Sequence, residues 1–248
     1  MLEPWRMGTV IRITQETPNT RRFWIQIPEL ENFDFKPGQF VTLDLPIHEQ
    51  RNKRWRSYSI ASWPDGSNVV ELVIVLLEGG AGTTYLFNEV GEGSELLLRG
   101  PQGVFTLPEV LEKDLFLVCT GTGIAPFRSM VQYLQLHGLK HRDIHLIYGC
   151  RTGEDLLYYN EMKELSRSMK GFHYHPTLSR EMREGFNQGY VHHLYQTLCT
   201  ERPEALFFLC GWKQMIDEAR LKIAEMGYDK KSIHLEHWRG REGSRRAQ

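Results

Sequence analysis

The sequence predicts two domains, an antiparallel β domain followed by an α/β domain built on a parallel sheet. Two observations lead to this prediction. In residues 1–108, short apolar or alternating stretches are separated by turn-forming residues, which is typical of an antiparallel barrel or sandwich. From residue 115 onwards, apolar strands alternate with helical periods, which indicates a parallel sheet covered by helices on both faces. The pattern changes near residue 110, so we place the domains at 1–108 and 109–248.

In the first domain, strands are expected where β-branched and aromatic residues gather or where apolar and polar residues alternate: 10–14, 22–27, 40–45, 69–77 and 96–98. Turn signals such as Pro37-Gly38 lie between these stretches. Only residues 84–88 have a locally helical pattern.

In the second domain, residues 107–113 are a predicted linker, after which strands and helices alternate. Apolar runs predict strands at 115–119, 144–148, 172–178, 205–210 and 233–236. Apolar residues at helical spacing predict helices from Pro126 onwards and at 156–169, 192–198 and 215–226.

Length and composition restrict the classes of function. A chain of 248 residues is long enough for two buried cores, and its net charge of -1 argues against a nucleic-acid binder. No apolar run reaches the ~18 residues of a membrane span, and the first residues lack the apolar core of a signal peptide. The four cysteines form no Cys-x-x-Cys pair and the ten histidines have no metal-like partner set. We therefore expect no metal site and a reduced, cytoplasmic setting.

The stretch 115–130 predicts a phosphate-binding turn between a buried strand and a helix. Gly121 and Gly123 permit close backbone approach, and Pro126 suits the first turn of a helix. Backbone amides and the positive end of the helix dipole then converge on one point. An ordinary glycine-rich connection is the alternative, because Pro126 stands where the dinucleotide fingerprint requires a third glycine.

The first domain contains two further stretches with polar chemistry. Arg56, Tyr58 and Ser59 place a cation, a flat ring and a hydroxyl along one short strand, which suits a diphosphate and a flat heterocycle. The loop 79–84 offers three glycines and two threonines before a helical segment, which again suits an anion. A polar surface strand and a flexible hairpin are the respective alternatives. Two anion sites in two domains indicate two phosphate-bearing ligands.

With these stretches, the chain resembles the ferredoxin–NADP reductase superfamily, in which an FAD-binding barrel precedes a nicotinamide-nucleotide domain. The resemblance covers almost the whole chain and implies a barrel rather than a sandwich. It rests on five motifs in order: Arg56-Ser57-Tyr58-Ser59, Gly80-Ala81-Gly82-Thr83, Gly100-Pro101-Gln102-Gly103 with Phe105, Thr120-Gly121-Thr122-Gly123-Ile124-Ala125-Pro126, and Cys210-Gly211 with Met215. These are similar to the flavin motif, the flavin-diphosphate loop, the closing turn of the barrel, the dinucleotide-diphosphate loop and the Cys-Gly motif near the nicotinamide.

The resemblance implies roles for these residues. Arg56 would hold the FAD diphosphate, Tyr58 would stack on the isoalloxazine, and Ser59 would hydrogen-bond near the flavin N5 atom. Cys210 would lie beside nicotinamide C4. The chemistry implied is hydride transfer between C4 and N5, for which the protein positions two rings and stabilises charge.

The end of the chain departs from the family. Glu236-His237-Trp238 is similar to a terminal Glu-x-aromatic motif, but the chain continues to Gln248. We expect Glu236 to join Ser59 and Cys210 as a catalytic residue. Trp238 is expected to cover the flavin face, with packing at the domain interface as the alternative.

The choice between NADP and NAD is predicted from the run after the strand at 172–178. Ser179 and Arg180 resemble the residues that bind the 2′-phosphate in the NADP-dependent members, and Tyr190 follows as their later tyrosine does. A hydroxyl and a guanidinium suit a phosphate, whereas an acidic residue would suit a free 2′-hydroxyl. Arg151 is a weaker candidate for the same phosphate, and an exposed basic loop is the alternative reading.

The expected function is an FAD-containing, NADP(H)-dependent reductase that passes single electrons to a separate ferredoxin or flavodoxin, and we expect it to be a monomer. The alternatives are the reductase component of an oxygenase, a free-flavin reductase, and a flavin-binding relay subunit of a larger complex. Arg51, Lys53 and Arg54 lie beside the flavin motif and are expected to be free to attract an acidic partner. A solvated loop is the alternative reading of this basic stretch.

Overall fold

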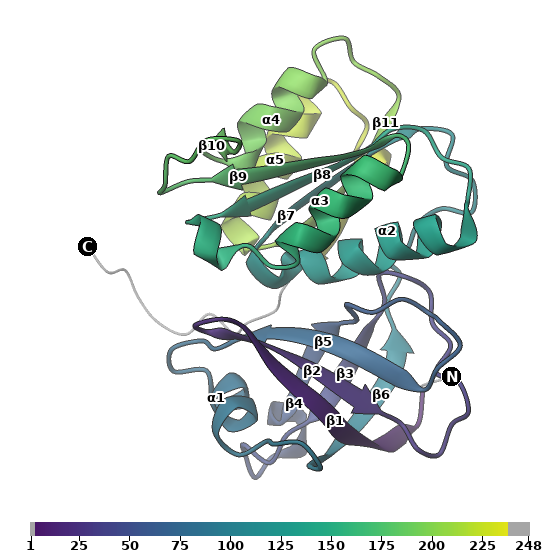
Figure 1. The fold of residues 1–248 in the computed structure, drawn as a ribbon, viewed down its shortest axis with the longest axis vertical. Coiled ribbons are helices and arrows are strands. Elements are labelled where there is room, and N and C mark those ends of the chain that lie inside the picture. The colour runs from purple at the N-terminus through teal and green to yellow at the C-terminus, as the bar shows by residue number, and fades with distance from the viewer. Residues whose placement is uncertain (1–2, 238–248) are drawn as a thin grey trace.

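The computed structural model describes residues 3–237, which form two domains that each contain one six-stranded sheet (Figure 1). The first sheet is antiparallel, with the strand order β4-β3-β6-β1-β2-β5. Its strands are β1 (Trp5–Thr17), β2 (Thr20–Gln26), β3 (Phe40–Asp44), β4 (Trp55–Ser59), β5 (Val69–Val75) and β6 (Glu95–Gln102).

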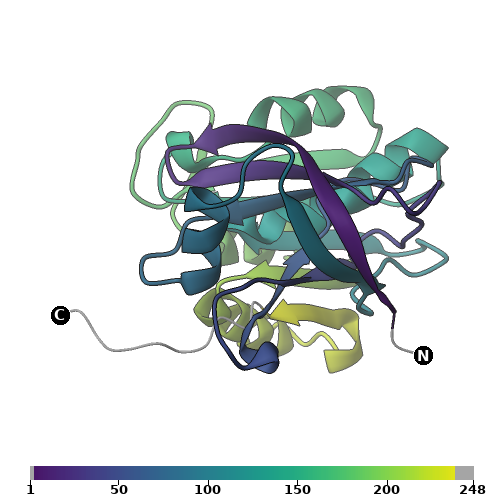
Figure 2. The same ribbon diagram turned by 90° about the horizontal axis from the view of Figure 1, so that it is seen from below.

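The first sheet curls until its two edge strands approach each other, as the view from below shows (Figure 2). Just after β4, Ile60 forms an antiparallel bridge with Leu72 of β5, and the Ala61 amide donates to the Glu71 carbonyl at 2.8 Å. The sheet is therefore a barrel that is not closed by continuous strand pairing. The predicted antiparallel barrel is confirmed. Its interior holds one cluster of apolar side chains, among them Val10, Phe23, Ile25, Leu43 and Leu98.

Several elements of the barrel differ from the predicted bounds, β1 and α1 among them. β1 extends well beyond 10–14, because its first half pairs with β6 and its second half pairs with β2. The helix α1 (Ala81–Asn88) begins before residue 84. Its first turn uses small and hydroxyl residues, and the Thr83 hydroxyl donates to the Gly80 carbonyl at 3.0 Å.

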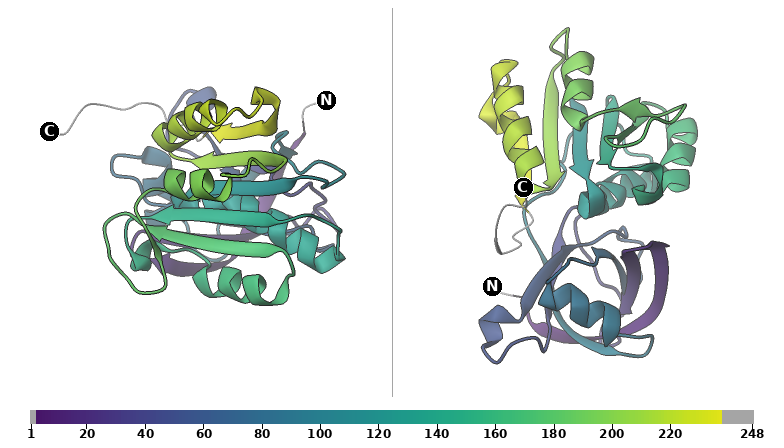
Figure 3. Two further views of the ribbon diagram at one scale, coloured as in Figure 1. Left: turned by 90° about the horizontal axis from the view of Figure 1, so that it is seen from above. Right: turned by 90° about the vertical axis from the view of Figure 1, so that its left-hand side faces the viewer.

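The second sheet is parallel throughout, with the strand order β10-β9-β8-β7-β11-β12, and its strands lie side by side in Figure 3. The predicted α/β domain is confirmed. The strands are β7 (Asp114–Thr120), β8 (Ile144–Cys150), β9 (Phe172–Leu178), β10 (Asn187–Gln188), β11 (Ala205–Gly211) and β12 (Ile233–His237). The order reverses between β7 and β11, and ligands of open α/β sheets bind at such a switch point.

Helices cover both faces of the parallel sheet, because β7 is apolar on both sides. Leu115 and Leu117 face one core, whereas Phe116 and Val118 face the other. The first core contains side chains of α2 (Ala125–His137) and α3 (Tyr159–Ser168), and the second contains those of α4 (Val191–Leu198) and α5 (Lys213–Glu225). α3 begins later than predicted, because Tyr158 has a left-handed backbone with φ 54°.

The two domains meet along α2, which runs along the boundary between them (Figure 1). The Phe105 ring of the barrel's closing turn lies 5.8 Å from the Phe127 ring of α2 and 5.4 Å from the Phe208 ring of β11. The sheets end and begin at Gln102 and Asp114, and the boundary at 108/109 between them stays a prediction. Within residues 3–237, no helix has both the length and the apolar character needed to cross a membrane.

Candidate functional site

The predicted dinucleotide loop is a turn of 3-10 helix, Gly121–Ile124, between β7 and α2. Gly121 has a left-handed backbone with φ 54°, and a Cβ added there would face mostly open space, with Trp212 Nε1 at 3.9 Å. At Gly123, a Cβ would lie 2.5 Å from the Cys210 carbonyl oxygen. Gly123 therefore lets the loop reach the end of β11, while Gly121 leaves the start of the turn open. This geometry fits a diphosphate.

The Cys-Gly motif at the end of β11 contacts this loop directly. Gly211 has φ 139°, and a Cβ there would collide with the Thr120 hydroxyl. The same hydroxyl accepts a hydrogen bond from the Trp212 amide at 3.2 Å. The two motifs, 90 residues apart between Thr120 and Cys210, thus form one structure at the switch point of the sheet.

The three predicted catalytic residues come together where the domains meet. The Ser59 hydroxyl, at the end of β4, donates to Glu236 Oε2 at 2.7 Å. The Cys210 thiol, near the end of β11, donates to the same oxygen at 3.6 Å. Glu236 lies on β12, which pairs with β11 and places Cys210 beside Glu236. One carboxylate oxygen therefore joins the flavin motif to the nicotinamide motif.

The environment keeps both acidic groups of this cluster from ionising easily. Burial raises the pKa of Glu236 above its ordinary value, although the hydrogen bonds from Ser59 and Cys210 act in the opposite direction. Burial and the charge of Glu236 raise the pKa of the Cys210 thiol well above its ordinary value. Cys210 is therefore a neutral hydrogen-bond donor rather than a thiolate nucleophile.

The predicted flavin-diphosphate residues also lie together. A Cβ added at Gly82, in the first turn of α1, would lie 3.0 Å from Arg56 Cγ and 3.1 Å from Arg56 Nε. Arg56 Nη1 donates to the carbonyl oxygens of Lys53 and Trp55 at 3.0 and 2.8 Å. A guanidinium beside a glycine at a helix start offers a cation and amides to a diphosphate, so Arg56, Gly80, Ala81, Gly82 and Thr83 fit FAD.

The neighbours of Arg56 in the motif point elsewhere. The Ser57 hydroxyl is hydrogen-bonded to the Thr42 hydroxyl of β3 at 3.0 Å. Tyr58 is only 8% exposed and packs with the barrel core. Its stacking on the flavin stays a prediction.

The predicted 2′-phosphate residues lie on two adjacent loops after β8 and β9. The Ser179 amide and hydroxyl both donate to the Cys150 carbonyl, at 3.0 and 3.2 Å. The Arg180 amide donates to the Arg151 carbonyl at 2.9 Å, so both arginines lie at this edge of the sheet and are exposed. Tyr190, 75% exposed, is the residue before α4.

Sequence reasoning missed a third arginine beside these loops. A Cβ added at Gly153 would collide with the Arg183 guanidinium, and the Gly153 amide donates to Glu181 Oε2 at 2.7 Å. Arg183 is only three positions after Arg180, which was the available signal.

Other predicted residues are placed differently from Ser59 or Cys210. Met215 is 7% exposed and packs in the core between the sheet and α4 and α5. The contact of Met215 with NADP stays a prediction, and Trp238 lies outside the described residues.

The expectation that Arg51, Lys53 and Arg54 are all free to attract an acidic partner is wrong, because Arg51 and Arg54 pair with Asp44 at 3.2 and 2.7 Å.

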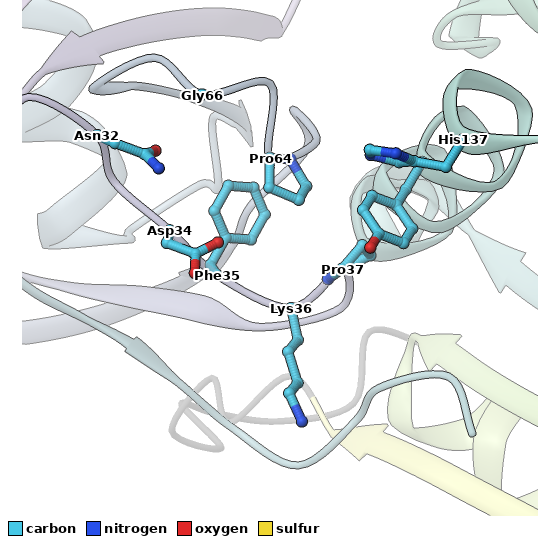
Figure 4. Close-up of a pocket in the computed structure, with 9 residues that line it drawn as sticks. Asn32, Asp34, Phe35, Lys36, Pro37, Pro64, Gly66 and His137 are labelled. Carbon is cyan, nitrogen blue, oxygen red and sulfur yellow. The ribbon is translucent and has the colours of Figure 1, made fainter. Parts of the chain in front are cut away.

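A pocket of about 360 Å³ lies away from this site. It lies between barrel loops and the C-terminal end of α2 (Figure 4), and its lining includes Phe35, Pro37, Pro64, Tyr133 and His137. The dinucleotide loop is at the other end of α2, about 20 Å away at the rise of an α-helix. Among residues 3–237, no group of three or more His, Cys, Asp or Glu side chains is placed to hold a metal ion.

Two protein-family models match successive parts of the chain. Residues 7–107 match the oxidoreductase FAD-binding domain, and residues 117–221 match the oxidoreductase NAD-binding domain. These matches confirm the prediction that the cofactors are FAD and a nicotinamide dinucleotide.

The chain is similar to curated reductases over most of its length. It is 33% identical to ferredoxin–NADP reductase B of Sorangium cellulosum, over 95% of this chain and 98% of that protein. It is 32% identical to the anthranilate 1,2-dioxygenase electron transfer component of Acinetobacter baylyi, over 79% of this chain but only 56% of that protein.

Solved structures of reductases share the fold. The crystal structure of the cytochrome P450 reductase GcoB from Amycolatopsis has a TM-score of 0.84 at 27% identity, covering 95% of this chain and 71% of that one. The ferredoxin NADP+ reductase from Neisseria gonorrhoeae with bound FAD and NADP has a TM-score of 0.80 at 25% identity, covering 94% and 98%.

The sequence, the fold and these comparisons agree. The chain belongs to the ferredoxin–NADP reductase superfamily. It is an oxidoreductase that uses FAD and NAD(P) for electron transfer.

Proposed function

We propose that this chain is an NADPH-dependent reductase that uses bound FAD to pass electrons one at a time to a separate ferredoxin or flavodoxin. The observation that carries the proposal is the contact of Ser59 and Cys210 with one oxygen of Glu236. It joins the flavin motif of the barrel to the nicotinamide motif of the α/β domain. A site for moving a hydride between two bound rings needs groups from both domains at one point.

The two cofactors would be held by residues that already lie together. Arg56 and the loop Gly80–Thr83 would hold the FAD diphosphate, and the loop Thr120–Ile124 would hold that of the nicotinamide dinucleotide. Bound FAD would supply a ring that can take up a hydride from the nicotinamide and give up the two electrons singly.

The chain's own contribution at the reacting atoms is a hydrogen-bonded proton path. The Ser59 hydroxyl can donate toward the flavin only when it turns away from Glu236 Oε2, 2.7 Å away. Ser59 would pass to Glu236 Oε2 the proton that is released when the reduced flavin gives up its two electrons, and the pKa of Glu236, raised by burial, would let this carboxyl hold it. Cys210, a neutral thiol at 3.6 Å, orients the carboxyl without carrying charge.

Preference for NADP(H) over NAD(H) is part of the proposal. Ser179, Arg180 and Arg151 lie on the loops that follow β8 and β9, at the same edge as the dinucleotide loop. Two guanidinium groups and a hydroxyl suit a 2′-phosphate dianion.

The second candidate is the reductase component of an oxygenase. Relatives with this name include the anthranilate dioxygenase component and the propane 2-monooxygenase reductase of Mycolicibacterium goodii. The chain spans 56% and 61% of their lengths. The chemistry at Ser59 and Glu236 is the same in both candidates, and only the acceptor differs. The monomeric state and the cytoplasmic setting stay predictions.

The test starts with the full chain loaded with FAD. NADPH should bleach the flavin absorbance under anaerobic conditions much faster than NADH does. The reduced protein is then offered a ferredoxin, a flavodoxin and free FMN, and the rate of reduction of each is followed. Faster reduction of one protein carrier than of free FMN supports the proposal. A flavin that NADPH does not bleach would overturn it, and reduction of free FMN alone would favour a free-flavin reductase.

A further inference from the structure

Arg128 lies buried at the domain interface, in the second turn of the helix that begins at the dinucleotide loop. Its side chain is 5% exposed, and two carboxylates pair with it from opposite sides. Within its own domain, Nε and Nη2 donate to the two oxygens of Glu161 on α3 at 2.7 and 3.0 Å. Toward the barrel, Nη1 donates to Glu71 Oε2 and to the Ala61 carbonyl, both at 2.9 Å.

Glu71 is the centre of the barrel side of this network. Its side chain is 3% exposed, and Oε1 accepts from Arg22 Nε at 2.6 Å and from the Tyr158 hydroxyl at 2.7 Å. Tyr158 belongs to the α/β domain, so two hydrogen bonds to Glu71 cross between the domains. The Arg128 guanidinium lies 4.4 Å above the Tyr158 ring, which closes the cluster.

The network is ionised in spite of its burial. Burial acts to raise the pKa of Glu71, but the Arg22 hydrogen bond and the charge of Arg128 outweigh it and lower that pKa. Burial acts to lower the pKa of Arg128, and the charges of Glu71 and Glu161 raise it. Buried charges of this kind are stable only in the geometry that pairs them, so the domains cannot slide without leaving one unpaired.

The position of this network connects the two cofactor motifs. Ala61, whose carbonyl accepts from Arg128, is two residues after Ser59, and its amide is bonded to the Glu71 carbonyl at 2.8 Å. Arg128 is two residues after Pro126 of the dinucleotide motif. The guanidinium therefore joins the strand that carries Ser59 to the helix that begins at the dinucleotide loop.

Other contacts between the domains include directional hydrogen bonds, such as that from Ser59 to Glu236, and apolar packing. The contacts of Phe105 with Phe127 and Phe208 are apolar, and apolar burial holds surfaces together without fixing their register. A planar guanidinium fork has fixed hydrogen-bond directions.

We infer that Arg128 is a positioning residue, whose bonds to Ala61 and Glu71 fix the flavin-motif strand against the dinucleotide loop at the separation that hydride transfer requires. The inference rests on the proposed function, and it adds a residue outside the cofactor motifs to the machinery of that reaction. Transfer between two rings is sensitive to small displacements, and a misplacement of about 1 Å can slow it about a hundredfold.

The test is Arg128→Lys, which keeps the charge but cannot hold Glu161, Glu71 and Ala61 in one plane. At saturating NADPH, the rate of flavin reduction should fall about ten- to a hundredfold. The affinity for NADP+, measured by calorimetry, should change less than about threefold, because the dinucleotide loop itself is intact. Independently of activity, amide hydrogen exchange of residues 60–72 should speed up.

The matched control is Glu161→Gln, which weakens a contact of Arg128 inside one domain and leaves the bonds to the barrel in place. It should lower the melting temperature but keep the saturating rate. If Arg128→Lys does not fold, Glu71→Gln removes the same charge pair from the barrel side and takes its place.

The outcomes separate the inference from the proposed function. A wild-type flavin that NADPH does not reduce defeats the proposed function, whatever the hydrogen exchange shows. If NADPH reduces the wild-type flavin, and Arg128→Lys is less stable but equally fast at saturating NADPH, the positioning role is overturned. A loss shared equally by Arg128→Lys and Glu161→Gln would also overturn it.

Discussion

At the scale of single residues, the site depends on which hydroxyl of the flavin motif reaches Glu236. Ser57 and Ser59 are two positions apart, yet Ser57 bonds to Thr42 inside the barrel sheet while Ser59 bonds to Glu236 of the other domain. The motif alone does not distinguish them, since both are serines beside Tyr58. The three-dimensional structure does, because only Ser59 lies at the end of β4, where the domains meet.

Ser59→Ala should bind FAD nearly normally but reduce it about ten- to a thousandfold more slowly, as for loss of one preorganised donor. The Ser59 hydrogen bond favours the ionised form of Glu236, so its removal should raise the pKa of that carboxyl further. Stopped-flow rates across pH measure both effects, and any limb due to Glu236 should move to higher pH. Ser57→Ala is the control and should keep the wild-type rate. Identical profiles for the two variants would remove Ser59 from the mechanism.

Arg180→Ala should raise the KM for NADPH about ten- to a hundredfold and leave the KM for NADH nearly unchanged. A charge-assisted hydrogen bond to the 2′-phosphate is worth about 1.5–3 kcal/mol, and NADH has no such phosphate. Steady-state kinetics with both coenzymes measure the effect, and NADH is the internal control. Arg183→Ala, at the loop beside Gly153, shows whether the third arginine shares the task. Equal losses with NADPH and NADH would contradict the assignment.

At the scale of elements, the sequence predicted each strand of the parallel sheet except the two-residue β10. The signal was clearest for β7 and β11, which are the short apolar runs expected of buried parallel strands. Bounds were less accurate where tertiary pairing decides them. β1 continues to Trp5 because β6 pairs with its first half, and β6 lies about ninety residues further along the chain. No local signal in residues 5–9 contains that information.

The sequence suggested only a structural or solvated place for the histidines of β8 and β9, and from the structure we expect two of them to affect acid stability. His145 Nδ1 and His175 Nε2 are 3.1 Å apart, and the His145 ring stacks on Phe116 at 4.8 Å. Burial and the neighbouring His173 lower the pKa of His145 to about 4. Burial and the neighbouring His145 lower that of His175 to about 4 as well.

Because these pKa values are depressed in the folded state, the unfolded chain binds protons more readily, with a histidine pKa of about 6.5. The free energy of unfolding should therefore be undiminished above about pH 6.5 and fall as the pH drops from there toward 4. Urea unfolding at pH 7.5, 6 and 5 measures the slope. His175→Gln should flatten it, whereas His193→Gln on the exposed side of α4 should not. An unchanged slope in His175→Gln would exclude this pair as a cause of acid sensitivity.

At the scale of the whole molecule, the two domains and their order were predictable, because the change of periodicity near residue 110 is a property of the sequence itself. The interface between them was not. In the sequence, nothing distinguishes Arg128 from the other polar residues of its helix. Its partners Glu71 and Glu161 lie 57 and 33 positions away along the chain. The fold of the α/β domain brings Glu161 to Arg128, and the docking of the domains brings Glu71 to it. Asp44, on β3, was also not foreseen as the partner of Arg51 and Arg54, because it is the pairing of β3 with β4 within the barrel that brings them together.

The acceptor surface depends on charge summed over the molecule. The segment around Lys53 follows β3 and precedes the flavin motif, and Asp44 offsets part of the charge of Arg51 and Arg54. Of these three residues, Lys53 is therefore the one whose change of charge should most affect association with an acidic protein acceptor. Lys53→Glu should lower kcat/KM for such an acceptor about three- to tenfold at 20 mM salt. The difference in kcat/KM between Lys53→Glu and the wild type should disappear near 0.5 M salt, where the screening length is about 4 Å.

Reduction of a neutral quinone should not change in Lys53→Glu, and Lys140→Glu in the other domain is the matched control. A loss that persists at high salt, or is shared by the quinone, would place the docking surface elsewhere.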